Sequence, residues 1–232
     1  MGYRDLTLSE AMRPPSLDAY SYLFSQVVDK ICADINDVLG QQNITTPLAL
    51  DCFSGCGWGS FMIAHQTGCF VTGVDGDEQN NAWSNRYFKH PKVLQAKSVF
   101  HFMLPPEAFH FVLSMESLEH LPASLAGAFI EQLAGAVKPG GCLYLTVPDA
   151  STVNLERDLW PFHFKYFAPS EIIGIVEGLG LELKDWWGVP QNAEERNVVN
   201  GLPQITRTMG PSEVALQRRQ SGWTNLYAFR RP

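Results

Sequence analysis

A short acidic and glycine-rich segment lies between an apolar run and a helical pattern: Leu50-Asp51-Cys52-Phe53-Ser54-Gly55-Cys56-Gly57-Trp58-Gly59. Glycine tolerates positive φ and lets the backbone approach a ligand closely. A second acidic residue, Asp75, ends the next apolar run, 18 residues after Gly57. A carboxylate at that place can accept hydrogen bonds from both hydroxyls of a ribose. Together the two features predict a site for an adenosine-containing cofactor.

The residues of the glycine turn distinguish between two cofactor classes. A nicotinamide site is typified by Gly-x-Gly-x-x-Gly, whereas this turn has a serine, Ser60, in place of the third glycine. Asp51 would also be an unfavourable neighbour for a pyrophosphate. S-adenosylmethionine carries a cationic sulfonium and an ammonium group, which an anionic strand end suits. We therefore expect S-adenosylmethionine, and a nicotinamide-dependent oxidoreductase is the alternative.

Strands and helices alternate from Pro47 onward. The expected strands are Leu48–Phe53, Cys69–Val74, Lys92–Val99, Phe109–Ser114, Cys142–Val147, Leu181–Trp187 and Asn225–Arg230. The expected helices are Phe61–Gln66, Asp77–Lys89, Ser124–Val137 and Glu171–Leu179, and an amphipathic helix from Ser16 to Gly40 precedes them. Fully apolar strands between helices predict a doubly wound α/β fold, a mostly parallel sheet covered on both faces. Such folds bind ligands at the carboxyl ends of the strands.

Composition and charge exclude several classes of protein. The 232 residues carry 17 Lys and Arg against 24 Asp and Glu, a net charge of −7, although residues 191–232 are basic. An acidic chain lacks the footprint for non-specific nucleic-acid binding. No apolar stretch approaches the length of a membrane span. The five cysteines are scattered and suit reduced thiols, so we expect a cytoplasmic protein. Cys52 and Cys56 lack a second Cys/His pair at ligand spacing, so we expect no metal site.

From Pro47 to Gly188 the chain resembles the class I S-adenosylmethionine-dependent methyltransferases, in particular the group that contains ubiquinone and glycan methyltransferases. The resemblance rests on the acidic glycine turn, on Asp75 and on three further runs. These runs are Phe109–Leu121 (FHFVLSMESLEHL), Val137–Pro148 (VKPGGCLYLTVP) and Pro161–Phe167 (PFHFKYF). The resemblance implies a Rossmann-like methyltransferase fold, a seven-stranded sheet whose last strand is antiparallel. It also implies a small-molecule or glycan-like acceptor.

The resemblance further implies which residues contact the cofactor. They are Asp51, Phe53, Gly55, Gly57, Asp75, Gly76, Ser98 and Met115. Ser98 is included because Lys97-Ser98 replaces the usual acidic adenine contact. Phe53 occupies the position of the motif's first glycine. The resulting pattern, Asp-x-Phe-x-Gly-x-Gly, is similar to that of DNA cytosine methyltransferases. Those enzymes need a Pro-Cys nucleophile where this chain has Met115-Glu116-Ser117, so the nucleic-acid reading is rejected.

Three residues are candidates for contact with the acceptor. Methyl transfer is an in-line displacement, so the protein must align the reactants, and a hydroxyl acceptor must also lose a proton to a base. His120 follows the fourth strand, and His163 lies in an aromatic segment after the fifth. Glu116 lies at the same carboxyl ends of the strands. A capping histidine and an aromatic lid packed on the sheet are the structural alternatives for the two imidazoles.

Two domain segments are expected: residues 1–46 as a helical lid or extension, and residues 47–232 as the methyltransferase domain. Within the second, the stretches 149–167 and 189–224 fit no strand–helix unit, and we expect them to form the acceptor side. The function predicted is methyl transfer to a small-molecule or glycan-like acceptor, at oxygen. A catalytically silent cofactor-binding subunit is a second alternative.

Overall fold

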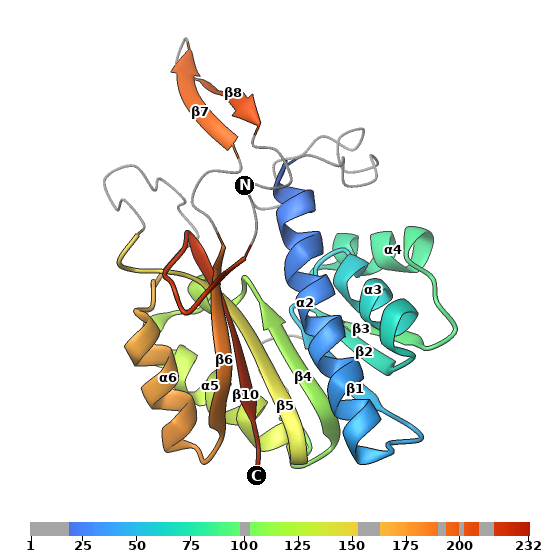
Figure 1. Ribbon diagram of the computed structural model, residues 1–232. Coiled ribbons are helices and arrows are strands. Elements are labelled where there is room, and N and C mark those ends of the chain that lie inside the picture. Colours follow the sequence, from blue (N-terminus) through green and yellow to red (C-terminus); the bar gives the residue numbers. More distant parts are fainter. Residues whose placement is uncertain (1–18, 98–102, 153–162, 190–193, 200–201, 209–215) are drawn as a thin grey trace.

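The main sheet sets the frame for the site. The computed structural model describes residues 19–97, 103–152, 163–189, 194–199, 202–208 and 216–232 (Figure 1). Within these residues one sheet has the strand order β3-β2-β1-β4-β5-β10-β6-β9. The strands are β1 (Leu48–Cys52), β2 (Phe70–Asp75), β3 (Val93–Lys97), β4 (Phe109–Met115), β5 (Val137–Pro148), β6 (Glu182–Val189), β9 (Gln217–Arg218) and β10 (Thr224–Arg230).

The strand directions confirm the expected fold class. Strands β1 to β5 pair in parallel, while β10 runs antiparallel to both β5 and β6. The sheet therefore has the predicted antiparallel last strand, inserted between two strands of the common direction. Strand β9 adds a two-residue antiparallel pairing to the outer edge of β6. Because β1, β2, β4 and β5 run the same way, their carboxyl ends meet at one edge.

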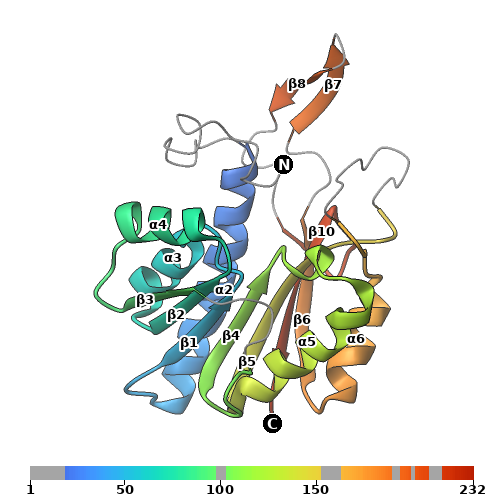
Figure 2. The same ribbon diagram turned by 180° about the vertical axis from the view of Figure 1, so that it is seen from behind.

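Helices cover both faces of the sheet (Figures 1 and 2). Helices α2 (Ala19–Gln42) and α3 (Trp58–Thr67) pack on one face, and α5 (Ala123–Ala136) and α6 (Pro169–Gly178) on the other. Helix α4 (Glu78–Tyr87) lies beside β2 and β3. Successive strand residues point to opposite faces, so Tyr144 joins the core under α2, whereas Leu143 and Leu145 join the core under α5.

Several element boundaries differ from the sequence expectation, and contacts to distant residues account for two of the differences. Helix α2 continues past Gly40 to Gln42, whose side-chain amide donates to the Gly140 carbonyl at 2.8 Å and anchors the last turn. Strand β5 begins at Val137, five residues before the expected Cys142. The expected turn over residues 138–141 is instead drawn into the strand, because Gly140 and Gly141 exchange backbone hydrogen bonds with Arg231 beyond β10.

The stretch 189–224 contains a hairpin that the sequence reading did not predict. Strands β7 (Glu194–Val199) and β8 (Leu202–Thr208) pair antiparallel in a sheet of their own. Figure 1 shows this hairpin beyond the edge where the parallel strands end. None of the helices in the part of the chain that the structure describes is long and apolar enough to cross a membrane.

Helix α5 provides a test of the packing. Ile130 is fully buried between this helix and the sheet, whereas Leu125 on the same helix is 47% exposed. Ile130→Ala should lower the free energy of unfolding by about 2–5 kcal/mol, since it removes buried methyl groups and leaves a cavity. Leu125→Ala should lower it by less than about 1 kcal/mol. Urea denaturation of both variants checks this, and equal losses would contradict the described face of α5.

Candidate active site at the carboxyl ends of the strands

The glycine turn after β1 has the conformation that its sequence predicts. Phe53, Gly55 and Gly57 all have positive φ, at 57°, 54° and 81°. A Cβ on Gly57 would lie 1.9 Å from the Ser84 hydroxyl oxygen, so this glycine is needed for packing against α4. A Cβ on Gly55 would meet nothing within 4 Å. The backbone at Gly55 therefore borders open space that a ligand can enter.

Asp75, at the end of β2, fastens the glycine turn. Its Oδ2 accepts a hydrogen bond from the Gly55 amide at 2.9 Å. Its Oδ1 accepts from the Asp77 amide at 2.8 Å and from the Asn80 side chain at 3.2 Å. A carboxylate has about four acceptor positions, so these bonds leave room for a ligand hydroxyl. Asp75 thus holds the glycine turn in place. Its contact with a ribose stays a prediction.

Asp51 lies beneath the turn and is buried. Its Oδ2 accepts a hydrogen bond from the Ser60 hydroxyl at 2.6 Å, at the start of α3. Burial raises the pKa of Asp51 to about 6; the Ser60 bond opposes this rise and the charge of Asp75 adds to it. A Cβ on Gly59 would lie 2.8 Å from the Met115 methyl and 3.6 Å from Asp51. Asp51 is thus screened from solvent, and it would act on a ligand mainly through its charge.

The other predicted cofactor residues lie around the same turn, with one exception. Phe53 packs edge-on against Phe129 of α5, with ring centroids 5.3 Å apart. Met115 ends β4 next to the turn, because β1 and β4 are paired neighbours. Gly76 is exposed in the turn between β2 and α4. Ser98 lies outside the described residues, so the structure does not place it.

The charge of this region fits a cationic cofactor. Asp51 and Asp75 are both buried at adjacent strand ends. Among the described residues, no lysine, arginine or histidine forms an ion pair with either carboxyl. A buried acid without a basic partner is unfavourable, and a positively charged ligand would offset that cost. The open space at Gly55 and these two acids therefore fit S-adenosylmethionine.

Glu116 follows β4 and has an unusual environment. Its backbone φ is +47°, in the left-handed region that non-glycine residues seldom adopt. The turn is held because the Glu116 amide donates to the Thr146 hydroxyl at 2.9 Å. The carboxyl Oε1 accepts from the Thr224 hydroxyl at 2.5 Å. Burial raises the pKa of Glu116 to about 7, although the bonds from Thr224 and Thr146 oppose the rise.

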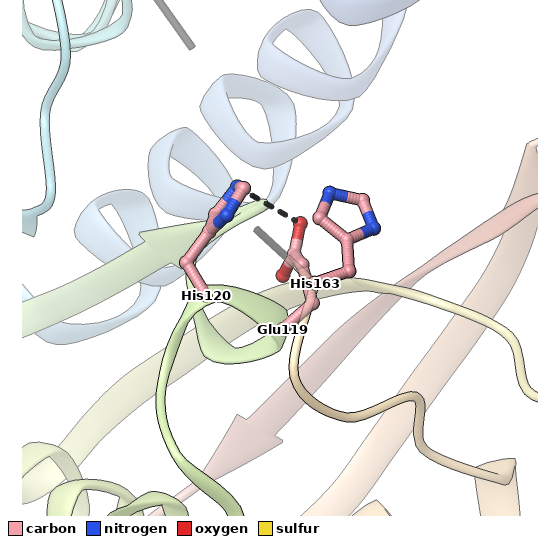
Figure 3. A group of neighbouring side chains, drawn as sticks. All are labelled: Glu119, His120 and His163. Atoms are coloured by element: carbon pink, nitrogen blue, oxygen red, sulfur yellow. Dashed lines mark ion pairs between the residues drawn. The ribbon is translucent and has the colours of Figure 1, made fainter. Parts of the chain in front are cut away.

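Glu119, His120 and His163 form a cluster (Figure 3), and the charge of Glu116 acts on Glu119. Glu119 and His120 belong to the short 3₁₀ helix η2 (Leu118–His120). Figure 3 shows the His163 ring facing them from the segment that follows β5. The His120 and His163 ring centroids are 4.8 Å apart, and the His120 Nε2 lies 3.9 Å from the Glu119 Oε1. The structure therefore brings together the two histidines that the sequence singled out.

The segment carrying His163 is held by backbone and side-chain contacts. The Phe164 amide donates to the Glu119 carbonyl at 2.7 Å, and Ala150 and Phe167 are joined by a backbone bond of 3.1 Å. The His163 Nδ1 lies 2.9 Å from the Tyr166 hydroxyl. Burial, with the neighbouring His120, lowers the pKa of His163 to about 4, so its ring is neutral near pH 7.

The structure describes only part of the aromatic run Trp160–Phe167. Phe164 is 60% exposed, so its ring does not pack into the core of the sheet. Trp160, Pro161 and Phe162 lie outside the described residues. His163 itself is half-buried, and Phe167 is fully buried beside β5. Among the described residues of the run, Phe164 is exposed, Phe167 is buried, and His163 lies toward the cluster.

Glu119 is the residue of this site that the sequence reading missed. It is 1% exposed, and its Oε2 has no hydrogen-bond partner among the described residues. Burial, together with the charge of Glu116, raises its pKa well above the usual range. Its position in Leu118-Glu119-His120 was visible as a motif. That an acid there turns inward depends on the η2 geometry, which no local pattern reveals.

A network on the antiparallel side joins the two stretches that fit no strand–helix unit. Asn225 of β10 donates to the Asp149 Oδ2 at 2.7 Å, and its Oδ1 accepts from the Gly222 amide at 3.0 Å. Burial raises the pKa of Asp149, but hydrogen bonds from Ser151 and Asn225 outweigh it and hold the pKa below its usual value. The stretch 149–167 begins at this network and the stretch 189–224 ends at it. Both points lie next to Glu116 and its hydrogen-bond partner Thr224.

A separate surface hollow of about 370 Å³ has no place in this site. Its lining is Ser84, Phe88, Lys89, His90, Pro91, Val93 and Gln95, from the end of α4 through β3. These residues lie at the β3 edge of the sheet, with β2 and β1 between them and β4. The hollow is shallow, and none of the predicted catalytic residues lines it. We therefore assign the site to the strand ends and not to this hollow.

Comparison with known proteins gives consistent matches. The family model described as "Methyltransferase domain" matches residues 39–185. A Mycolicibacterium smegmatis protein described as a "probable S-adenosylmethionine-dependent methyltransferase" is 27% identical over 169 residues, 71% of this chain. A ubiquinone biosynthesis O-methyltransferase from Serratia proteamaculans is 29% identical over 110 residues, 40% of this chain. The matched parts span 61% and 43% of the lengths of these two relatives.

Solved structures of low sequence identity share the fold. A Haloferax volcanii methyltransferase solved in complex with the Trm112 activator has a TM-score of 0.62 at 16% identity, covering 89% of this chain and 94% of that one. Magnesium protoporphyrin IX methyltransferase from Synechocystis, with bound S-adenosylhomocysteine, has a TM-score of 0.59 at 16% identity. The match covers 90% of this chain and 84% of that enzyme. These matches support the predicted Rossmann-like architecture.

The role of Asp75 can be tested by binding. Asp75→Ala should weaken S-adenosylmethionine by about 2–4 kcal/mol, or roughly 30- to 700-fold in Kd, because it removes a charged acceptor and releases the Gly55 amide. Asp77→Ala is the matched control, since Asp77 caps α4 and should cost about 1 kcal/mol of stability without changing Kd. Calorimetry measures both. An unchanged Kd in folded Asp75→Ala would refute the ribose assignment.

The raised pKa of Asp51 predicts two pH dependences. A folded-state pKa of about 6, above the ordinary 3.8, means that the folded protein holds this proton more tightly. Asp51 therefore contributes a fall in stability as pH rises from about 4 to 6. Affinity for the cationic cofactor should rise over pH 5–7.5 as the carboxyl ionises. Both trends should be weaker in Asp51→Asn, measured by thermal unfolding and calorimetry, and an unaltered pH profile would contradict the assignment.

Proposed function

Because this chain belongs to the methyltransferase-domain family, we propose that it transfers a methyl group from S-adenosylmethionine to a hydroxyl oxygen of a small-molecule or glycan-like acceptor. The family model covers more than half of the chain, and the relatives confirm the predicted cofactor class. The acceptor, its oxygen and the roles of individual residues are our proposal. One arrangement carries it: the Glu119 carboxyl and the imidazoles of His120 and His163 lie within 4.8 Å of one another, and the charge of the buried Glu116, at the end of β4, acts on Glu119.

The cofactor residues hold one reactant in place. S-adenosylmethionine, when bound, supplies an electrophilic methyl group on a positively charged sulfur. We assign its adenosine portion to Asp75, Gly76 and Ser98, and its charged end to Asp51 and the turn at Gly55. Phe53, Gly57 and Met115 complete the cradle by shaping the turn. Alignment of the two reactants by such contacts can account for several kcal/mol of the barrier.

Glu116 is the proposed proton acceptor. A base is most effective when its pKa lies near the working pH, and that of Glu116 is about 7. In the transfer the C–S bond breaks with its electron pair remaining on sulfur, the O–C bond forms, and the hydroxyl proton passes to Glu116. His163, with a pKa of about 4, is a weaker base. We assign His163 and His120 to the wall that positions the acceptor hydroxyl.

The surrounding segments suit an acceptor side. We propose that residues 1–46 extend or lid the methyltransferase domain of residues 47–232, and that the stretches 149–167 and 189–224 enclose the acceptor. Support comes from the Asn225 network, which joins the ends of both stretches next to Glu116. The enzyme would work in the cytoplasm, which is consistent with five cysteines that form no disulfide in the described part of the chain.

Two observations favour an oxygen acceptor that is not a nucleic acid. One relative is named a ubiquinone biosynthesis O-methyltransferase, although the match covers 40% of this chain. The net charge of −7 disfavours a polyanionic substrate.

The acceptor can be sought by incubating the enzyme with methyl-labelled S-adenosylmethionine and panels of phenols, sugars and amines, with product masses and fragmentation recorded. We expect O-methyl products, and products methylated only at nitrogen would refute the oxygen assignment. A protein that binds the cofactor but transfers to no compound would favour the silent-subunit alternative.

The role of Glu116 predicts a specific kinetic change. Glu116→Gln keeps the shape of the side chain but removes its basicity, so kcat should fall by about 10²–10⁴-fold while the cofactor Kd stays unchanged. The wild-type kcat should rise with pH through about 7, and this limb should be lost in the variant. Glu131→Gln, on the exposed face of α5, is the control. Full kcat in Glu116→Gln would rule out Glu116 as the base.

A further inference from the structure

We propose that Glu119, His120 and His163 bind a divalent transition-metal ion, with zinc as the best-fitting member of the class. The ion would present an open coordination position to the acceptor oxygen. Binding of the ion follows from the cluster alone, whereas its role toward the acceptor rests on the proposed function. No other group of three such ligands meets within the described part of the chain.

The three side chains have the right atoms at nearly the right separation. One ligand atom from each residue lies within 4.8 Å of the other two, and the Glu119 Oε1 to His120 Nε2 distance is 3.9 Å. Two ligands that are each about 2.1 Å from one zinc ion are at most about 4.2 Å apart. Closing the cluster around an ion therefore needs movements of about 1 Å. The His120 side chain is 46% exposed, so its ring is less tightly enclosed than the Glu119 carboxyl, which is 1% exposed.

The buried state of Glu119 is a second and independent observation. Its side chain is 1% exposed, and its Oε2 has no hydrogen-bond partner among the described residues. No lysine or arginine of the described chain forms an ion pair with it. Buried carboxylates in proteins are normally paired, hydrogen-bonded or bound to a metal. A cation between Glu119 and the two imidazoles would satisfy this carboxyl.

The backbone presets the cluster before any ion arrives. Glu119 and His120 are consecutive residues of helix η2, so both side chains project from the same short turn. The hydrogen bond from the Phe164 amide to the Glu119 carbonyl then fixes the neighbouring His163 opposite that turn. The His163 Nδ1 is engaged by the Tyr166 hydroxyl at 2.9 Å. Such a bond to the second ring nitrogen is typical of metal-binding histidines, because it orients the ring.

The ligand types indicate the class of metal. Imidazole suits zinc, iron, cobalt and copper, while magnesium and calcium prefer all-oxygen sites. Two histidines and one glutamate form a set of three protein ligands, as in catalytic zinc sites, where the remaining position holds water or substrate. The exposure of His120 indicates that the remaining position faces the open side of the cluster.

The ion would make the acceptor hydroxyl a better nucleophile. A bound divalent cation lowers the pKa of a coordinated hydroxyl, so the proton leaves before or during attack. In the balanced step the O–H bond breaks with the proton passing to Glu116, and the metal-bound oxygen attacks the methyl carbon. The C–S bond then breaks with its electron pair remaining on sulfur. The metal undergoes no change of oxidation state, so no oxidant or reductant is needed.

Metal binding can be measured without knowing the acceptor. The full chain, without a polyhistidine tag, is stripped with a chelator and titrated with Zn²⁺, Co²⁺, Mn²⁺ and Mg²⁺ by calorimetry. We expect one Zn²⁺ or Co²⁺ per chain and weaker Mg²⁺ binding. Glu119→Gln, His120→Asn and His163→Asn should each weaken Zn²⁺ by about 100-fold or more. His90→Asn, which removes a histidine elsewhere, is the control, and circular dichroism verifies that every variant is folded.

Several outcomes would overturn the proposal. It fails if the stripped protein binds no Zn²⁺ or Co²⁺ at a one-to-one ratio, if Mg²⁺ binds more tightly than Zn²⁺, or if the three variants bind Zn²⁺ as the wild type does. Methyl transfer that is undiminished in the metal-free enzyme would remove the catalytic role while leaving the proposed function intact. Conversely, one-to-one Zn²⁺ binding by an enzyme that methylates only nitrogen would support the site and refute the oxygen acceptor.

Discussion

Buried acids at one edge of the sheet are the constraint on which the site depends. Four parallel strands end there, and an acidic residue lies at or next to each end: Asp51, Asp75, Glu116 and Asp149. Each must be compensated in a poorly hydrated environment. Backbone amides and hydroxyls supply part of the compensation, and a cationic ligand is needed for the rest. The crowding of acids along this edge thus favours a positively charged cofactor over a neutral or anionic one.

The compensation comes from elements that are far apart in the chain. Asp75 uses the turn after β1, while Glu116 uses Thr224, which is 108 residues away. Asp149 uses Asn225 in the same antiparallel strand. Strand β10 is therefore more than the last strand of the sheet, because its first two residues, Thr224 and Asn225, donate hydrogen bonds to the acids that follow β4 and β5. The arrangement of these acids therefore depends on the pairing of the carboxyl-terminal strand.

Much of this arrangement could be predicted from the sequence, and the reason differs between residues. Asp51, Gly55 and Asp75 are local signals, since an acid or a glycine at the end of an apolar run has few structural alternatives. The fold class was predicted from the alternation of such runs, which needs no knowledge of distant contacts. The strand order of the sheet confirms it. The particular contacts of each candidate site residue remain to be tested by the experiments above.

Other features depended on information that local patterns do not contain. The burial of Glu119 is set by a 3₁₀ turn and by the backbone bond from Phe164, a contact across 45 residues of sequence. The early start of β5 depends on pairing with Arg231, near the end of the chain. The hairpin β7–β8 is a different case, because Asn200-Gly201 between its strands is a strong hairpin signal that could have been recognised.

That hairpin has an evolutionary consequence. Among the described strands, β7 and β8 pair only with each other, so the register of β6 and β10 does not depend on their length or sequence. Extending a surface connection costs little free energy, because the closure entropy grows only slowly with length. Mutations, insertions or deletions in this arm can accumulate while the acids at the strand ends keep their partners. The fold thereby separates a segment free to diversify among descendants from a core whose chemistry tolerates little change.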